Sequence, residues 1–381
     1  MPPKSLRCVL AIVAVMGALA TILLGSTGTP LILAAGKGSA RVPAWDRKAA
    51  ERYLDDREIW WQGWDRTQKD HGTYCVSCHT QAPYGLARPV LRKDLGEPDP
   101  AGAEQAMLAS IEKRVHLWKE VQPFYLDAKS GPGKEVESRN AESVLNSLIL
   151  ASYDQLTGKM SDTTRMAFAN AWALQSQGGP VAGAWVWQNF HYKPRESPES
   201  EYHGAALMAV AVGSAPGGYS RDPAIALNLA ALRAYLRSHY DAQPLLNKIV
   251  ALWASAHLPD LLTREQREQM IGEIDRLQRE DGGWSLADLG TWKRVDNTPL
   301  VNRSDGYATG LIVLTLEENR ARNAAANIAR GRAWLVANQD QSTEAWPAWS
   351  LNKDRDPKSD AGPFMSDAAT AYAVLALEAR R

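Results

Sequence analysis

Cysteine is scarce in this chain, with three residues in 381. Cys8 lies in an apolar segment near the N-terminus, so Cys75 and Cys78 are the only cysteines in the rest of the protein. Two cysteines cannot build the set of several disulfides on which small secreted domains depend. The Cys75 and Cys78 pair therefore has a role other than a disulfide framework.

An excess of either charge is also missing. The chain has 43 basic and 43 acidic residues, so its formal net charge is zero. Without a basic excess, the protein has no general means of holding a phosphate backbone, and we expect no nucleic acid partner. Phenylalanine is rare, at 4 residues against 14 tryptophans, so the aromatic packing depends mainly on indole rings.

Long apolar runs are absent except at the N-terminus. Lys4 and Arg7 precede an uninterrupted apolar and small-residue run over 8–24. This order is typical of an export signal, although 17 residues is also near the lower limit for a membrane-spanning helix. We expect residues 1–40 to be a signal peptide or an N-terminal membrane anchor, and the rest of the chain to be periplasmic or otherwise extracytoplasmic.

The alternation of apolar and polar residues that marks a β-strand is missing too, so we expect an all-α protein. Amphipathic helical segments alternate with segments that are apolar around most of the helix. Two concentric layers require this alternation, with one helix of each pair inside and its partner outside. The sequence predicts six pairs: 46–70 with 78–92, 101–121 with 140–156, 162–176 with 202–213, 223–238 with 245–257, 264–279 with 305–317, and 325–338 with 366–380.

An internal repeat supports the helix pairs. Gln278 recurs 61 residues later as Gln339, and each is followed by a polar turn and then a tryptophan, Trp284 or Trp346. A fixed period of this size indicates a repeated helix pair. A glutamine at a helix end can bond free carbonyls while the tryptophan covers the turn, so we expect these residues to be structural.

The glutamine, the Gly-x-Trp turn at 282–284 and the Ala-rich helix that follows resemble the Gln-Trp repeats of the squalene-hopene and oxidosqualene cyclase family, over most of 160–381. The resemblance implies an (α/α)6 toroid, here a single one over 41–381, as in those cyclases and the protein prenyltransferases. The Asp-x-Asp-Asp acid of the cyclases is absent. The prenyltransferase zinc site needs a cysteine ligand, and no cysteine follows Cys78. The resemblance therefore leaves open whether the protein is an enzyme.

The two cysteines belong to a C-x-x-C-H segment over 75–79. In c-type haem attachment, two thiols at this spacing bond to the haem vinyl groups and the adjacent histidine binds the iron. We therefore expect one covalent haem c on Cys75 and Cys78, with His79 as the iron ligand. A local disulfide, and a zinc site completed by distant histidines, are the alternatives.

Three further residues are candidates for chemistry because they open apolar helices. Asp305, Asp367 and His203 lie where a rim of the toroid is expected, and a carboxylate there could act as an acid or a base. The alternative for the two aspartates is capping of free helix amides. For His203 the alternative is a hydrogen-bonded histidine of the core.

Together these features predict an exported, cyclase-like toroid with one covalent haem c, acting in electron transfer or another haem-linked redox process with a redox partner protein. A terpenoid or polyprenyl cyclase with a non-standard acid is the first alternative. The second is a toroid that binds an apolar lipid or terpenoid without turnover. Membrane association through the N-terminal segment is compatible with each.

Overall fold

The computed structural model describes residues 44–100 and 102–379. The predicted signal or anchor, with Cys8, lies outside the described residues. The described residues form one compact unit. Within the part of the chain that is described, no helix has the length and apolar character needed to cross a membrane.

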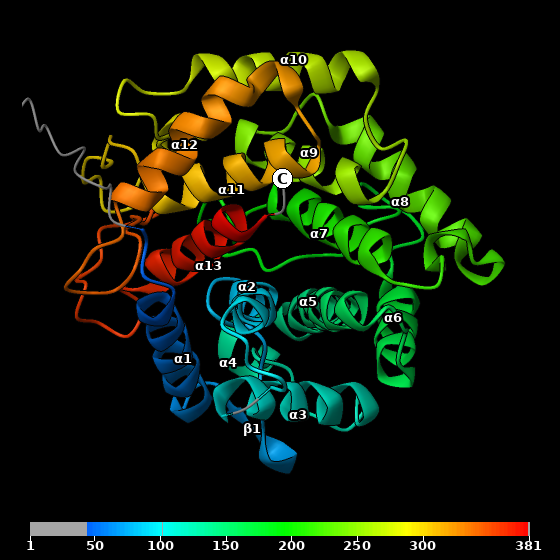
Figure 1. Ribbon diagram of the computed structural model, residues 1–381. Coiled ribbons are helices and arrows are strands. Elements are labelled where there is room, and N and C mark those ends of the chain that lie inside the picture. The colour runs from blue at the N-terminus through cyan, green and yellow to red at the C-terminus, as the bar shows by residue number, and fades with distance from the viewer. Residues whose placement is uncertain (1–43, 101, 380–381) are drawn as a thin grey trace, which may run out of the picture. The chain divides into compact units, whose positions relative to one another are not determined.

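In the described part of the chain, twelve long helices form two concentric layers (Figure 1). The inner helices pack in the order α2, α5, α7, α9, α11, α13 and back to α2, which closes the ring. Their bounds are α2 Gln81–Asp94, α5 Lys134–Thr157, α7 Ser200–Ser214, α9 Leu245–His257, α11 Gly306–Glu318 and α13 Phe364–Glu378. The outer helices are α1 Arg47–Gly63, α3 Gly102–His116, α6 Asp162–Leu174, α8 Ala226–His239, α10 Arg264–Arg276 and α12 Ala325–Ala337. This arrangement confirms the predicted all-α toroid of six helix pairs.

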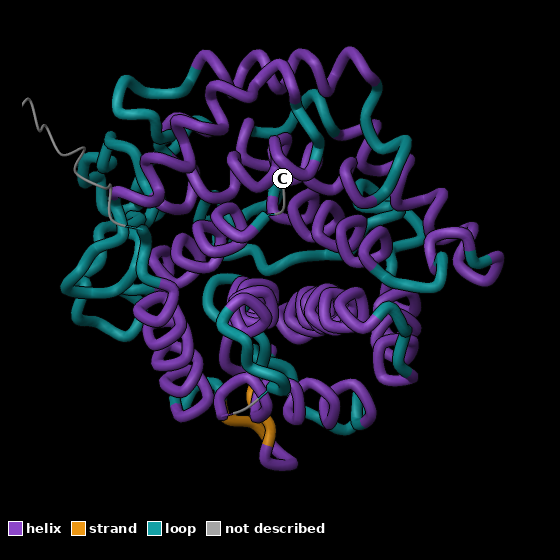
Figure 2. Tube along the Cα trace, in the orientation of Figure 1, coloured by secondary structure: helices purple, strands orange, loops and turns teal. Residues whose placement is uncertain are grey.

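Long loops and short elements connect the pairs (Figure 2). Two-residue strands β1 (Gln68–Lys69) and β2 (Thr73–Tyr74) form an antiparallel hairpin, which the sequence analysis did not predict because two residues are too few to show alternation. The remaining short helices are α4 Asp127–Ser130, η1 Asp70–Gly72, η2 Tyr219–Arg221, η3 Pro223–Ile225, η4 Leu286–Leu289 and η5 Arg322–Ala324.

The inner helices pack closely because small residues face one another across the ring. In α11 every residue from Gly306 to Leu316 is buried. A Cβ on Gly310 would lie 2.7 Å from the carbonyl carbon of Tyr372 in α13, well inside van der Waals contact. Only glycine allows the two backbones to approach this closely.

All six inner helices run in the same direction. At one face, Thr80 directly before α2 donates a hydrogen bond to Asp367 in the first turn of α13. At the other face, His257 at the end of α9 contacts Ser214 and Glu318, the last residues of α7 and α11. We call the face where the inner helices begin the loop face, and the opposite one the C-terminal face.

The repeated glutamines and tryptophans stabilise the turns, as the sequence predicted. Gln278 Nε2 donates hydrogen bonds to two backbone carbonyls, one of them Asn327 of the next outer helix. Gln339 makes the equivalent pair of bonds in the last repeat. Trp284 and Trp346 have no exposed surface, and each indole donates to a carbonyl of the preceding outer helix.

Candidate functional site

The C-x-x-C-H segment lies on the loop face, in the turn that leads into α2. Cys75 is buried and Cys78 is half-buried, and both are free thiols rather than a disulfide. Burial raises the pKa of Cys75 to about 12 and that of Cys78 to about 11. Both sulfurs are therefore protonated at neutral pH and are weak nucleophiles in this state.

A hydrogen-bond chain fixes the tautomer of His79. Its Nδ1 lies 2.9 Å from Thr80 Oγ1, and Thr80 donates its single hydroxyl proton to Asp367 Oδ2 at 2.7 Å. Because that proton is already used, Nδ1 must carry the hydrogen and Nε2 keeps its lone pair. Tyr53 and Arg57 of α1 each donate to Asp367 Oδ1 at 2.8 Å, which holds the carboxylate in place.

The donor set of this segment fits a c-type haem. Two thiols at the required spacing are followed by an imidazole with an available Nε2, and burial lowers the pKa of His79 to about 3, so that the ring is neutral as a metal ligand must be. The structure gives less support to the alternative of a zinc site. Within 44–100 and 102–379, no group of three or more His, Cys, Asp or Glu side chains could hold a metal ion.

Aromatic rings from separate parts of the chain meet around His79 and continue across the loop face. Trp61 lies parallel to Phe124, with ring centroids 6.3 Å apart, and Tyr125 contacts Phe190 edge-on at 4.9 Å. We call this set the aromatic strip: Trp60, Trp61, Trp64, Phe124, Tyr125, Phe190 and Phe364. Six of its seven members are only half-buried, so ring surface remains accessible to a ligand.

Glu137 lies near the Phe190 end of the strip, and a second glutamate, Glu201, lies close enough to feel its charge. Glu137 in the first turn of α5 pairs with Lys134 at 2.6 Å and accepts a hydrogen bond from the Asn189 amide at 3.1 Å. Glu201 lies in the first turn of α7, and its pKa is raised to about 7 by burial and by the charge of Glu137. The Lys134 ammonium also lies 4.7 Å from the Phe190 ring centroid, which connects Glu137 to the strip.

The two carboxyl groups lie in different environments. Burial and the charge of Glu137 raise the pKa of Glu201 to about 7, so near neutral pH Glu201 retains a proton for a large part of the time. Glu137 is paired with Lys134 and accepts a hydrogen bond from a backbone amide. A carboxyl group that keeps its proton near neutral pH, together with a second carboxyl group in a different environment, is the arrangement used for paired acid and base catalysis. The sequence analysis missed both residues, because no motif surrounds them.

The three catalytic candidates named from the sequence do not converge. Asp305 is 2 % exposed and caps α11, accepting hydrogen bonds from the Ala308 and Leu286 amides at 2.8 and 2.5 Å. His203 is buried in α7 beside Trp187. Only Asp367 is part of the His79 site, where it acts through Thr80.

Comparison with known proteins shows that this chain is similar in fold to solved structures. No protein-family model and no curated protein sequence matches the chain. The α-1,6-mannanase GH76A of Salegentibacter sp. HEL1_6 matches with a TM-score of 0.51 and 11% identity, over 87% of this chain and 98% of that chain. An inactive variant of the same mannanase in complex with α-1,6-mannotetrose matches with a TM-score of 0.50 and 12% identity, again over 87% and 98%.

These findings correct the family and the function predicted from the sequence. The cyclase assignment is wrong: the similar solved structures are mannanases with the same toroidal fold. The haem-linked redox function, the cyclase alternative and the apolar-lipid alternative are likewise contradicted. The error has a physical origin, because the Gln-Trp repeat closes helix ends and covers turns. Such a repeat reflects how a toroid is stabilised and does not indicate which reaction the toroid catalyses.

Proposed function

We propose that the protein is a glycoside hydrolase, with a glycan bound along the aromatic strip and cleaved at Glu201 and Glu137. The observation that carries the proposal is the pair itself: Glu201, whose pKa of about 7 is raised in part by the charge of Glu137, and Glu137, which is paired with Lys134 near one end of an exposed aromatic surface. Glycoside hydrolysis uses such a pair of carboxyl groups on either side of the scissile bond.

In this mechanism, Glu201 is the general acid and protonates the glycosidic oxygen as the bond breaks. Glu137, held by Lys134 and the Asn189 amide, acts at the anomeric carbon. It either bonds to this carbon and is later displaced by water, or takes a proton from the water that attacks it. The aromatic rings contribute binding, because the C–H faces of a pyranose pack against them.

The first substrates to test are α-linked mannooligosaccharides, because the structures of similar fold are α-1,6-mannanases. We expect release of new reducing ends from α-1,6-mannotetraose, or from another member of a panel of α- and β-linked glycans. Products are identified by mass spectrometry. A folded protein that leaves every glycan of the panel intact would refute the proposal.

Binding along the strip makes a separate prediction for Phe190. Phe190→Ala removes the ring next to Lys134, and we expect KM to rise about tenfold, the loss of roughly one aromatic contact, with little change in kcat. Phe190→Tyr keeps the ring and is the control that should retain the original KM. Equal KM values for all three proteins would show that the glycan does not use this ring.

We further propose that the C-x-x-C-H segment carries one covalent haem c and that residues 1–40 export the chain to the compartment where attachment occurs. The support is the spacing of Cys75 and Cys78 and the available Nε2 of His79. When bound, haem supplies an iron centre held by His79. The glycoside hydrolase proposal does not depend on this group.

Haem attachment is tested by expressing the full chain together with a cytochrome c maturation system. We expect a denaturing gel band that stains for haem, and loss of the stain when Cys75 and Cys78 are both replaced by Ser. His79→Ala should keep the covalent stain and change the absorption spectrum, because only the iron ligand is removed. An unstained band from correctly exported protein would rule out the cofactor.

A further inference from the structure

The C-terminal face contains a cavity that the proposed reaction does not use. It has a volume of about 950 Å³ and lies between the ends of α9 and α11 and the start of α12. Sites for small molecules usually have volumes of about 300 to 1,000 Å³. Part of its wall is apolar, and includes Leu316, Ala325 and Ile328.

The acidic side chains of this cavity already have partners. Glu317 accepts hydrogen bonds from Arg332 at 2.9 and 3.1 Å. Glu318 Oε2 accepts a hydrogen bond from Trp253 Nε1 and lies within hydrogen-bond distance of His257 Nε2, both at 2.6 Å. Both carboxylates are therefore already engaged by other side chains of the fold.

Two arginines of the cavity have no such partners. Over the described residues, neither the Arg320 nor the Arg322 guanidinium has a hydrogen-bonded or ion-paired side chain, and both residues are exposed. A guanidinium presents a planar array of donors that matches the oxygens of a carboxylate, sulfonate or phosphate. Two free cations beside an apolar wall are complementary to an anion with an apolar body.

We infer that this cavity binds a small amphiphilic anion, with its acidic group on Arg320 and Arg322 and its apolar part against Ala325 and Ile328. The site lies at the opposite ends of the inner helices from the aromatic strip. Its occupation is therefore separate from binding of a glycan on the loop face, and the two proposals can fail independently.

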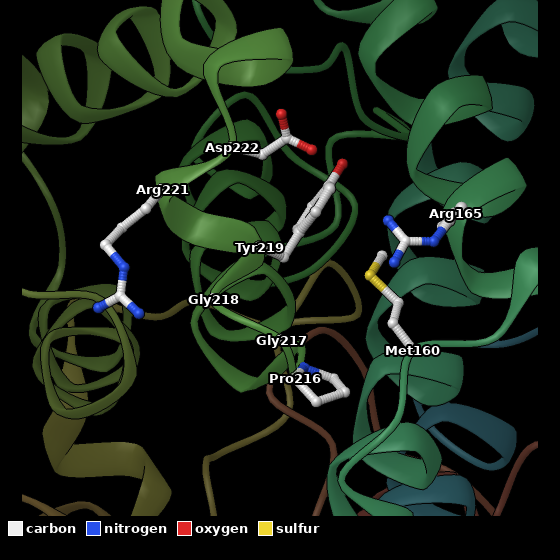
Figure 3. Close-up of a pocket in the computed structure, with 8 residues that line it drawn as sticks. All are labelled: Met160, Arg165, Pro216, Gly217, Gly218, Tyr219, Arg221 and Asp222. Atoms are coloured by element: carbon white, nitrogen blue, oxygen red, sulfur yellow. The ribbon is translucent and has the colours of Figure 1, made fainter.

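A smaller cavity on the same face lacks these features. It has a volume of about 260 Å³ and is lined by Arg165, Tyr219 and Arg221, among others. Figure 3 shows that, of the two arginines, Arg165 points toward Tyr219 and Arg221 points away from it. The cavity is lined by Asp222 as well as by the two arginines, and its wall is mostly polar, so it does not match an amphiphilic anion. Arg221 is therefore a suitable control position for the larger cavity.

The inference is tested by fluorescence titration of the whole protein with 8-anilinonaphthalene-1-sulfonate, which has an apolar ring system and one sulfonate. We expect saturable binding at a single site. Replacing both Arg320 and Arg322 with Ala should raise Kd at least about tenfold, since two charge-assisted contacts are lost. Arg221→Ala removes an exposed arginine elsewhere and should leave Kd unchanged.

A second variant tests the apolar part without changing charge. Ala325 is exposed at the first turn of α12, so Ala325→Trp is compatible with folding and places an indole in the cavity. We expect it to weaken binding of the probe at least about fivefold by occupying its volume. Binding that is unchanged in both the double arginine variant and Ala325→Trp, or that shows no saturation, would overturn the inference.

Discussion

Glu201→Gln lowers kcat/KM for the glycan substrate by about 10²- to 10⁴-fold, the usual contribution of a general acid. Glutamine keeps the size and polarity of the side chain but has no acidic proton to donate. The fall should appear in kcat rather than KM, because the proton is transferred only as the glycosidic bond breaks. The measurement is initial-rate kinetics on whichever glycan of the panel the protein cleaves.

The control is Glu199→Gln, two residues earlier at the start of the same helix. Glu199 pairs with Lys193 at 2.6 Å, so this variant removes a carboxylate that already has a partner. We expect its activity to remain within about threefold of the original. Equal losses in Glu199→Gln and Glu201→Gln would indicate a general effect of negative charge at the start of α7, and would remove Glu201 from the role of acid.

The same assignment fixes the direction of the pH dependence. The pKa of Glu201 is raised to about 7 by burial and by Glu137. As a general acid it works in the protonated form, so kcat/KM should decline as pH rises through about 7, and this limb should be missing from the residual activity of Glu201→Gln. A profile that instead rises through this range would make Glu201 a general base.

Stability gives an independent check with a definite sign. An unfolded glutamate loses its proton near its ordinary pKa of 4.5, whereas burial and Glu137 raise the pKa of folded Glu201 to about 7. Between these values the folded state binds more protons, so this group makes the protein less stable as pH rises. Glu201→Gln removes this pH-dependent loss of stability. Its melting temperature near neutral pH should equal or exceed the original, which separates lost chemistry from lost folding.

The positions of these glutamates explain why the sequence predicted the fold better than the site. Inner helices were identified by runs of apolar residues, and the run in α5 begins at Ala141 although the helix begins at Lys134. Glu137 therefore lay outside the expected segment, in the polar first turn. The same applies to Glu201, because α7 was expected from 202 and begins at Ser200.

The other parts of the site differ in how far apart their residues lie in the sequence. The C-x-x-C-H segment is contiguous and could be found by spacing alone. The chain from His79 through Thr80 to Asp367 joins residues 287 positions apart, and only closure of the ring brings α13 beside α2. The aromatic strip likewise combines α1, two loops and α13. A single sequence contains no signal that these segments meet.

Trp284→Ala should lower the free energy of unfolding by roughly 3 to 5 kcal/mol, the usual result of emptying a buried indole site. Trp284 has no exposed surface, and its indole donates a hydrogen bond to the Ile274 carbonyl at 2.8 Å. A Cβ on Gly331 in α12 would lie 2.7 Å from the indole, so the ring fills the space between two outer helices. Alanine leaves a cavity there and removes the indole's hydrogen bond to the Ile274 carbonyl, which keeps its bond from the Leu277 amide at 3.1 Å.

Two variants separate the contributions to this effect. Trp284→Phe keeps most of the buried apolar volume and loses the indole N–H, so it should cost about 1 to 3 kcal/mol, from one lost hydrogen bond and a smaller cavity. Trp292→Ala removes a half-buried indole from the same loop, whose N–H donates to Leu286 at 3.1 Å, and should cost less than Trp284→Ala. Urea unfolding followed by circular dichroism gives the three values.

The order of the three free energies of unfolding is a stronger test than any one of them. If Trp284 stabilises the turn between α10 and α11, Trp284→Ala should be the most destabilised variant, and the folded fraction should retain whatever glycan cleavage the original protein shows. This follows because Trp284 is buried against outer helices, whereas the proposed acid, Glu201, lies in the first turn of α7. A Trp284→Ala protein as stable as Trp292→Ala would mean that the repeated tryptophan is not what holds the helix pairs together.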